Sequence, residues 1–190
     1  MRWAFVLLIA LACPSKAERY LTAAEAQNRC FPKASRFEAV GIELAREQIK
    51  EIERQTGTKV RNPKPRIWTA WQQTNLLGVV FVDEVIGKHD LVDYALALSP
   101  KGEVLQLEIL EYREHYGGQI RRPEWRQQFK GKRWNHSVKL NDDIYNISGA
   151  TLSCRHVTEG VKRLLVAFEL VVRPRLLPDA GVPNDAPPKN

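Results

Sequence analysis

The stretch of this chain best suited to chemistry is a run of small residues that ends in a hydroxyl. Ser148, Gly149 and Ala150 lead into Thr151, at the point where a polar turn becomes an amphipathic helix. The unpaired N–H groups and the positive dipole end of such a helix start favour a phosphate. Ser148 is predicted to be the N-cap, and Gly149 and Ala150 keep bulk away from the first turn. The sequence therefore predicts a phosphate that is held at the Thr151 hydroxyl or esterified to it.

The residues after Thr151 predict a helix with one buried face, and Leu152 and Ser153 belong to its first turn. Apolar side chains recur at the spacing i, i+4, i+7, i+8 and i+11, at Val157, Val161, Leu164, Leu165 and Phe168. The charged residues are predicted to lie off this face, where Glu159 is placed to pair with Lys162 or Arg163. We expect this helix to pack on the core.

A second segment suited to binding begins at Glu114, directly after a predicted strand. The pair Gly117-Gly118 allows positive φ and a close approach of the backbone to a flat ligand. Tyr116 or Trp125 is predicted to stack on such a ligand or to flank it. Basic residues around this segment could neutralise a phosphate or an anionic ring: Arg121, Arg122, Arg126 and Lys130. A structural loop with a solvated basic face is the alternative.

The elements that must position these residues are a sheet and several helices. Four runs rich in β-branched, leucine and aromatic residues predict strands at Ile67–Gln72, Leu77–Ile86, Leu91–Leu98 and Val104–Tyr112. Short turn sequences separate the last three, which predicts an antiparallel meander. Helices are predicted at Thr22–Cys30, Glu43–Gln55 and Pro123–Phe129. The fold class is therefore α+β, with N-terminal helices and a C-terminal helix packed on an antiparallel sheet.

The N-terminus has the features of an export signal. Arg2 is a short basic region, Trp3–Ala12 is apolar, and Ser15-Lys16-Ala17 resembles a cleavage site. The apolar run is shorter than the roughly 20 residues that span a bilayer. We expect residues 1–17 to be a signal peptide and the protein to be periplasmic or at the outer face of the membrane. Lipidation of Cys13 is an alternative anchor.

The rest of the chain divides into three parts. Residues 18–66 are predicted to be an N-terminal helical segment, residues 67–170 the α+β domain, and residues 171–190 a proline-rich disordered tail. The formal net charge of +7 fits an anionic ligand, an anionic membrane surface or an acidic partner. No known nucleic-acid-binding motif accompanies this charge, so we expect no nucleic acid partner.

Cysteine and histidine usage narrows the chemistry further. Cys30 and Cys154 survive cleavage and could pair in an oxidising compartment, and two separate buried thiols are the alternative. Neither cysteine has a metal or haem spacing. The four histidines are scattered and lack the arrangement of nucleophile, base and orienting group that a hydrolase needs.

The tetrapeptide Ser148-Gly149-Ala150-Thr151 resembles the attachment motif of the FMN-binding domain family. These domains occur in the flavin subunits of sodium-translocating NADH:quinone reductases and of Rnf-type complexes, and as stand-alone exported proteins. In that family a phosphoester bond joins the motif threonine to the FMN phosphate. The resemblance implies that Thr151 carries covalent FMN, with Leu152 and Ser153 also at the site.

The segment after the sheet resembles the same family, in which a Glu-Thr-Pro-Gly-Leu-Gly loop lies close to the flavin. Glu114 and Gly117 match this loop, whereas His115, Tyr116 and Gly118 replace Thr, Pro and Leu. The resemblance runs over roughly residues 78–168 and is nearest to the stand-alone exported members. It implies that Glu114, Tyr116, Gly117, Gly118 and Trp125 contribute to the flavin site.

One position departs from the family pattern. The attachment motif normally has an acid six residues before the threonine, which helps a flavin transferase to recognise the site, and here that residue is Tyr145. Asp142 and Asp143 lie slightly upstream. Two alternatives stay open: the transferase uses Asp143 instead, or attachment is incomplete.

The resemblance implies an electron carrier rather than a self-contained enzyme. We expect a flavin transferase to install the FMN and membrane electron-transfer proteins to be the redox partners. An exported binding or scaffold module without covalent flavin is the main alternative. In that case the small residues before Thr151 would serve only a tight join between the polar turn and the helix.

Overall fold

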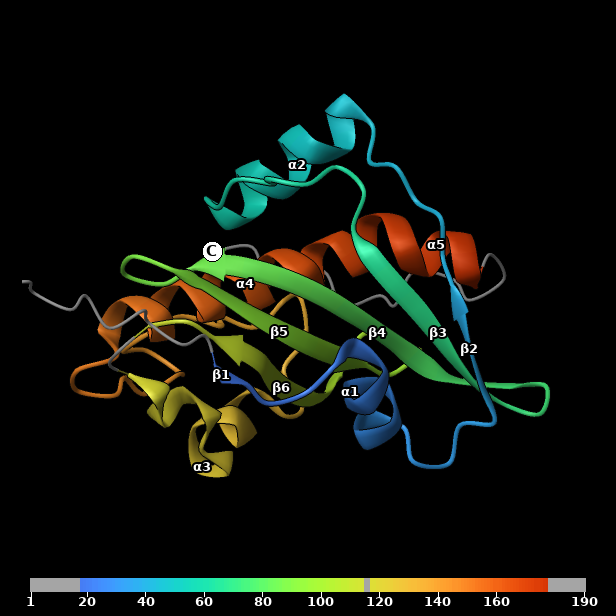
Figure 1. The fold of residues 1–190 in the computed structure, drawn as a ribbon. Coiled ribbons are helices and arrows are strands. Elements are labelled where there is room, and N and C mark those ends of the chain that lie inside the picture. The colour runs from blue at the N-terminus through green and yellow to red at the C-terminus, as the bar shows by residue number, and fades with distance from the viewer. Residues whose placement is uncertain (1–17, 115–116, 178–190) are drawn as a thin grey trace, which may run out of the picture.

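The computed structural model describes residues 18–114 and 117–177 and shows an antiparallel sheet covered by helices (Figure 1). The strands are β1 (Glu18–Arg19), β2 (Arg36–Ala39), β3 (Arg66–Gln72), β4 (Asn75–Ile86), β5 (Leu91–Leu98) and β6 (Val104–Tyr112). Their order is β1-β6-β5-β4-β3-β2, and every neighbouring pair is antiparallel. Strands β2 to β6 form a meander, which confirms the predicted α+β class. The predicted signal peptide, Cys13, His115, Tyr116 and residues 178–190 lie outside the described residues.

Both faces of the central strands are buried. Val79, Phe81 and Val85 of β4 face a large core beneath the C-terminal helix, whereas Val80 and Val82 face a smaller core beneath the first helix. This two-sided burial explains why the central strands read as nearly continuous apolar runs. The sequence missed β1 and β2, which are short edge strands with little apolar character.

The first two helices are close to their predicted positions. Helix α1 (Ala23–Cys30) begins with the predicted capping box, in which the Glu25 amide donates to Thr22 Oγ1 at 3.2 Å and the Thr22 amide donates to the Glu25 carboxylate at 2.7 Å. Helix α2 (Arg46–Thr56) begins three residues later than predicted and ends at Gly57, whose φ is +68°. Helix α2 packs on the long C-terminal helix rather than on the sheet centre (Figure 1).

The segment between β6 and the C-terminal helix contains three short helical pieces. They are η1 (Gly118–Arg121), α3 (Pro123–Arg126) and η2 (Gln127–Phe129). Proline at the first position of α3 agrees with the predicted helix start. Ile120, Trp125 and Phe129 of these pieces join the large core, which fixes the segment against β6.

The long helix α4 (Thr151–Ala167) covers the large core, and two predictions about its ends are wrong. Its N-cap is Ala150, which offers no side-chain oxygen, while Ser148 lies exposed in the preceding turn. The chain also stays helical beyond residue 170, through a π-helical segment η3 (Phe168–Val172) and helix α5 (Arg173–Leu176). Buried Val171 and Val172 hold this segment on the core, so the prediction that disorder begins at residue 171 is wrong.

Arg163 also differs from its predicted place off the buried face. Its side chain is buried, and its guanidinium donates to Asp83 Oδ2 at 2.5 Å and to the Lys59 carbonyl at 3.0 Å. The hydroxyl of buried Tyr94 donates to the same Asp83 oxygen at 2.6 Å. A charge on the apolar face is tolerated here because a carboxylate and a carbonyl satisfy it. The predicted pairing of Glu159 with Arg163 is therefore wrong.

The two cysteines do not form a disulfide. Cys30 belongs to the small core on one face of the sheet, and Cys154 belongs to the large core on the other face. Burial raises the pKa of the Cys30 thiol to about 12 and raises the pKa of Cys154 above its usual value. The alternative of two separate buried thiols is the one that the structure has.

Candidate functional site

The start of α4 opens onto a pocket of about 770 Å³, within the range of roughly 300–1,000 Å³ that is usual for small-molecule sites. Two chain segments far apart in the sequence line it. One is the turn between β4 and β5 together with Glu114 at the end of β6, and the other is the helix start. The lining residues are Lys88, His89, Asp90, Glu114, Gly149, Ala150, Thr151, Leu152 and Ser153.

Thr151 is the first residue of α4, and its hydroxyl lies at the pocket. Asn146 Nδ2 donates to Thr151 Oγ1 at 3.0 Å. The first intrahelical bond joins the Cys154 amide to the Ala150 carbonyl at 2.9 Å, so the amides of residues 151–153 precede it. Such amides have no partner within the helix and attract an anion. Because Ala150 cannot cap them with a side chain, they face whatever ligand occupies the pocket.

Ser153 is buried and linked to the sheet. Its hydroxyl lies 3.0 Å from the Tyr112 hydroxyl at the end of β6. Burial is the main cause that raises the pKa of Tyr112 above its usual value, so this phenol stays protonated at neutral pH. The contact joins the first turn of α4 to the end of β6 at Ser153, which also lines the pocket.

Gly117 brings the two predicted binding segments into contact. Its φ is +93°, and a Cβ there would come 2.5 Å from the Tyr112 hydroxyl and 3.0 Å from Ala150 Cβ. Only glycine fits such a conformation and such a close approach. The loop after β6 therefore packs directly beside Ala150, the residue that immediately precedes α4. Gly118 has open space around it, because a Cβ at this position would have no atom within 4 Å.

Glu114 organises the turn on the other side of the pocket. One carboxylate oxygen accepts from the His89 amide at 2.5 Å and from the Asp90 amide at 3.0 Å. Burial alone would raise the pKa of Glu114, but the amides of Asp90, His89 and Lys88 together hold that pKa below its usual value. The carboxylate is thus committed to shaping the turn.

Trp125 does not line the pocket, contrary to the prediction that it stacks on a ligand. It is buried in the large core, where it makes an edge-to-face contact with Phe129 at a centroid separation of 5.1 Å. Its indole Nε1 donates to the Tyr145 carbonyl at 2.9 Å. Trp125 therefore supports the loop before Thr151. The other candidate for stacking, Tyr116, lies outside the described residues.

Two of the four predicted basic residues, Arg121 and Arg126, are engaged elsewhere. Arg126 donates to the Leu107 carbonyl at 2.7 Å and to the Glu108 carboxylate at 2.5 Å, and Arg121 lies 3.8 Å over the ring of Tyr20. None of Arg121, Arg122, Arg126 and Lys130 lines the pocket; among its lining residues the cation is Lys88. The sequence predicted a turn at Gly87-Lys88-His89-Asp90 but gave no sign that this turn lies beside the start of α4 and lines the pocket.

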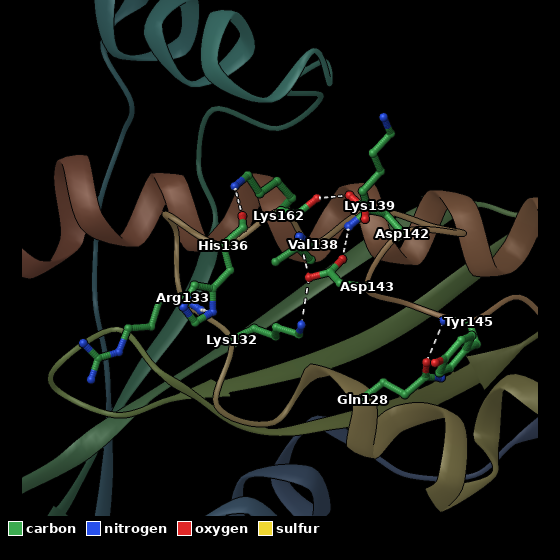
Figure 2. Close-up of polar contacts among 11 residues, drawn as sticks. Gln128, Lys132, Arg133, His136, Val138, Lys139, Asp142, Asp143, Tyr145 and Lys162 are labelled. Atoms are coloured by element: carbon green, nitrogen blue, oxygen red, sulfur yellow. Dashed lines mark hydrogen bonds and ion pairs between the residues drawn. The ribbon is translucent and has the colours of Figure 1, made fainter. Parts of the chain in front are cut away.

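Asp143 is enclosed in its own loop (Figure 2). Its carboxylate accepts from the Val138 amide at 3.0 Å, from the Lys139 amide at 2.7 Å and from Lys132 Nζ at 2.8 Å. Burial would raise the pKa of Asp143, but these donors, Lys132 foremost, hold it below the usual value. Asp143 thus closes the loop that precedes Tyr145 rather than projecting toward solvent.

Tyr145 occupies a rigid and prominent place. Its amide donates to Gln128 Oε1 at 2.6 Å (Figure 2). Its carbonyl accepts from Trp125 Nε1 at 2.9 Å, so both backbone groups are hydrogen bonded. Its side chain is 77% exposed. The position at which the resembled family has an acid is therefore a fixed, exposed tyrosine in this chain.

Metal and membrane chemistry find no support in the described part of the chain. Within residues 18–114 and 117–177, no group of three or more His, Cys, Asp or Glu side chains could hold a metal ion. In the same ranges no helix combines the length and the apolar character that crossing a bilayer requires.

Comparison with known proteins identifies the domain. The model of the FMN-binding domain family matches residues 87–166, which include the turn after β4, Glu114 and the start of α4. The chain therefore contains an FMN-binding domain. Its fold is similar to that of NqrC from Shewanella oneidensis, with a TM-score of 0.53 and 16% sequence identity over 75% of this chain and 84% of that chain. No curated protein matches the sequence significantly.

The residues at the pocket fit FMN. The phosphate suits the free amides and the hydroxyl at the start of α4, because these donors complement a negative charge. Gly149, with φ of +83° and open space where a Cβ would lie, leaves room for a phosphate at the helix start. The remaining volume suits a ring system between Leu152 and the turn at Lys88.

Proposed function

We propose that this protein is an electron carrier that holds FMN through a phosphoester bond to Thr151. The observation that supports this most strongly is that Thr151, the last residue of the motif, is also the first residue of α4 and lines a pocket of about 770 Å³. The match to the FMN-binding domain family covers this pocket. When bound, FMN supplies transfer of one or two electrons through its ring system.

The residues of this chain hold and orient the cofactor. The amides of residues 151–153 neutralise the phosphate, and Lys88 adds a positive charge across the pocket. Glu114 keeps the Lys88–Asp90 turn in place through its bonds to the His89 and Asp90 amides. The buried contact between Tyr112 and Ser153 holds the first turn of α4 against β6. The protein thus binds and orients the flavin and excludes water from one side of it.

Attachment requires a separate enzyme. Among the described residues, the side chain that hydrogen bonds to the Thr151 hydroxyl is the Asn146 amide, which cannot act as a base. An alcohol without a base is a weak nucleophile. We therefore propose that a flavin transferase installs the FMN on the exported protein. A covalent bond is useful outside the cytoplasm, where lost cofactor cannot be replaced, and membrane electron-transfer proteins are the proposed partners.

Intact-mass measurement tests this function. The chain is produced in exported form together with a flavin transferase, beside a Thr151→Ala variant and a control variant, Glu159→Gln, at an exposed position of α4 outside the pocket. We expect native protein and Glu159→Gln to gain the mass of one FMN less one water, and Thr151→Ala to gain none. A colourless native protein without added mass would instead favour the binding or scaffold module.

A further inference from the structure

Asn146 is the side chain in contact with the atom at which we propose the attachment. Its amide nitrogen lies 3.0 Å from Thr151 Oγ1, and the two residues are five positions apart in the sequence. Both lie on the solvent side of the α4 start rather than in the core. A transferase can therefore approach the Thr151 hydroxyl while Asn146 still contacts it.

The chain before Asn146 is rigid. Both backbone groups of its neighbour Tyr145 are hydrogen bonded, to the Gln128 side chain at 2.6 Å and to the Trp125 indole at 2.9 Å. Trp125 is itself 3% exposed and packs in the core. Gln128 is tied to the same element, because its Nε2 donates to the Trp125 carbonyl at 3.1 Å. The backbone that leads into Asn146 is therefore held in place.

The chain after Asn146 is equally constrained. The Ala150 amide donates to the Ile147 carbonyl at 3.0 Å, and Gly149 has a φ of +83°. This tight turn leads directly into Thr151, the first residue of α4. A short loop anchored at both ends places the Asn146 amide against the Thr151 hydroxyl with little freedom to move away.

We propose that Asn146 is a positioning residue for the attachment of FMN to Thr151, an inference that rests on the function proposed above. By donating to Oγ1, the amide selects one orientation of the hydroxyl and leaves its hydrogen and a second lone pair available. Once Oγ1 is bonded to phosphorus, the same amide lies beside the phosphate and donates to one of its oxygens. Asn146 thus serves both before and after the bond forms.

The transfer that it assists balances with a flavin dinucleotide as donor. Thr151 Oγ1 forms a bond to the phosphorus of the FMN half, and the pyrophosphate P–O bond breaks. The nucleoside monophosphate leaves with that oxygen, and the hydroxyl proton passes to a base of the transferase. Correct orientation of the attacking oxygen speeds such a displacement.

Single-turnover and steady-state kinetics of attachment test this role. Purified chain is incubated with a flavin transferase and flavin adenine dinucleotide, and the added mass is followed in time. Loss of one hydrogen bond to the reacting group corresponds to about a tenfold change in rate. We expect kcat to fall about tenfold in Asn146→Ala and in Asn146→Asp, which lacks the donor, with KM for the protein substrate nearly unchanged. Asn146→Gln keeps an amide and should recover part of the rate.

Glu159→Gln, an exposed position farther along α4 that does not line the pocket, is the control and should attach FMN at the native rate. Thermal unfolding of each variant reports whether the fold is intact. An unchanged kcat in Asn146→Ala would contradict the positioning role, and so would a change confined to KM, which would indicate a docking contact. Failure of the native chain to accept FMN would overturn the proposed function itself, and the positioning role with it.

Discussion

The start and the middle of helix α4 differ in whether their polar groups are already paired within the protein. In the middle, buried Arg163 and Tyr94 and partly buried Asp83 form a cluster whose polar groups are satisfied by one another. At the start, Thr151 and the first amides of the helix line an open pocket, and Ala150 provides no cap. The same helix thus has a closed polar cluster that stabilises the fold and an open one that is free to bind.

The contrast also appears in the glycines of the two regions. Gly160 lies against the Tyr94 hydroxyl, where no side chain fits, whereas a Cβ at Gly149 would have nothing within 4 Å. In the middle of α4 glycine allows close packing. At the start of α4 glycine is required by its φ of +83° and leaves open space for a ligand. Stability and binding can therefore be altered separately.

The largest effect on stability is expected from Arg163→Met. Removal of the buried guanidinium leaves the partly buried Asp83 carboxylate without its charged partner, which should lower the free energy of unfolding by about 3 kcal/mol. Urea unfolding measures this change. The double variant Asp83→Asn/Arg163→Met should recover part of the loss, and an equally unstable double variant would contradict the pairing.

A smaller loss is expected from Gly160→Ala. Its Cβ would collide with the buried Tyr94 hydroxyl and lie 3.1 Å from Val85 Cγ1, which should cost about 2 kcal/mol. FMN attachment should stay at the native level, because the pocket is not touched. Gly149→Ala sharpens the comparison, since backbone strain at φ +83° should slow attachment without any collision. Similar attachment rates in Gly160→Ala and Gly149→Ala would contradict the view that the middle and the start of α4 affect stability and binding separately.

Glu114→Gln should destabilise the turn at the pocket by about 1 kcal/mol at neutral pH, because the amides of His89 and Asp90 lose a charged acceptor. The lowered pKa of Glu114 means that its contribution is present above the unfolded pKa and is lost as the pH falls through the folded pKa. The difference between native and variant should therefore shrink in acid. Unfolding measured at pH 7 and below pH 4 tests this, and a difference that grows in acid would contradict it.

The smallest effect on stability is expected from Asp93→Asn in strand β5. Burial, and then Glu84 and Glu111 against Arg113, raise the pKa of Asp93, so its charge is disfavoured at neutral pH. The variant should be more stable than native protein by about 0.5 kcal/mol at pH 7, after solvent screening. Because the folded pKa of Asp93 is raised, ionisation of Asp93 destabilises the native fold. Below the unfolded pKa the group is protonated in both states, so the stability advantage of Asp93→Asn should vanish there. Thermal unfolding across this range measures it, and a less stable variant at pH 7 would show that the ion pair with Arg113 dominates.

Strong local patterns made the sheet and helix α1 predictable. Strands β5 and β6 have the predicted bounds, and the Thr22–Glu25 capping box is present. The start of α4 was misplaced because Ser148 is a good N-cap by type, yet the turn closed by the Ala150 amide moves the helix start to Thr151. Arg163 was misplaced because helical periodicity does not reveal that Asp83 lies on the facing strand.

At the candidate site, the sequence assigned the Thr151 motif and the Gly117 loop to one binding site, and the structure packs Gly117 against Ala150. It did not predict the turn at Lys88, because proximity across the sheet depends on strand register rather than on local sequence. Trp125 was assigned to the ligand by its residue type. In the structure its ring is buried in the core, and its N–H group donates to the Tyr145 carbonyl. Residue type indicates capability, and only packing decides its use.

Mapping the flavin on the peptide chain tests the central claim most directly. Exported protein matured with a flavin transferase is denatured, digested and analysed by tandem mass spectrometry. We predict that FMN remains on the peptide after denaturation and that fragment ions place it on Thr151. Flavin that is released on denaturation, or that is found on another residue such as Ser148 or Ser153, would contradict the account.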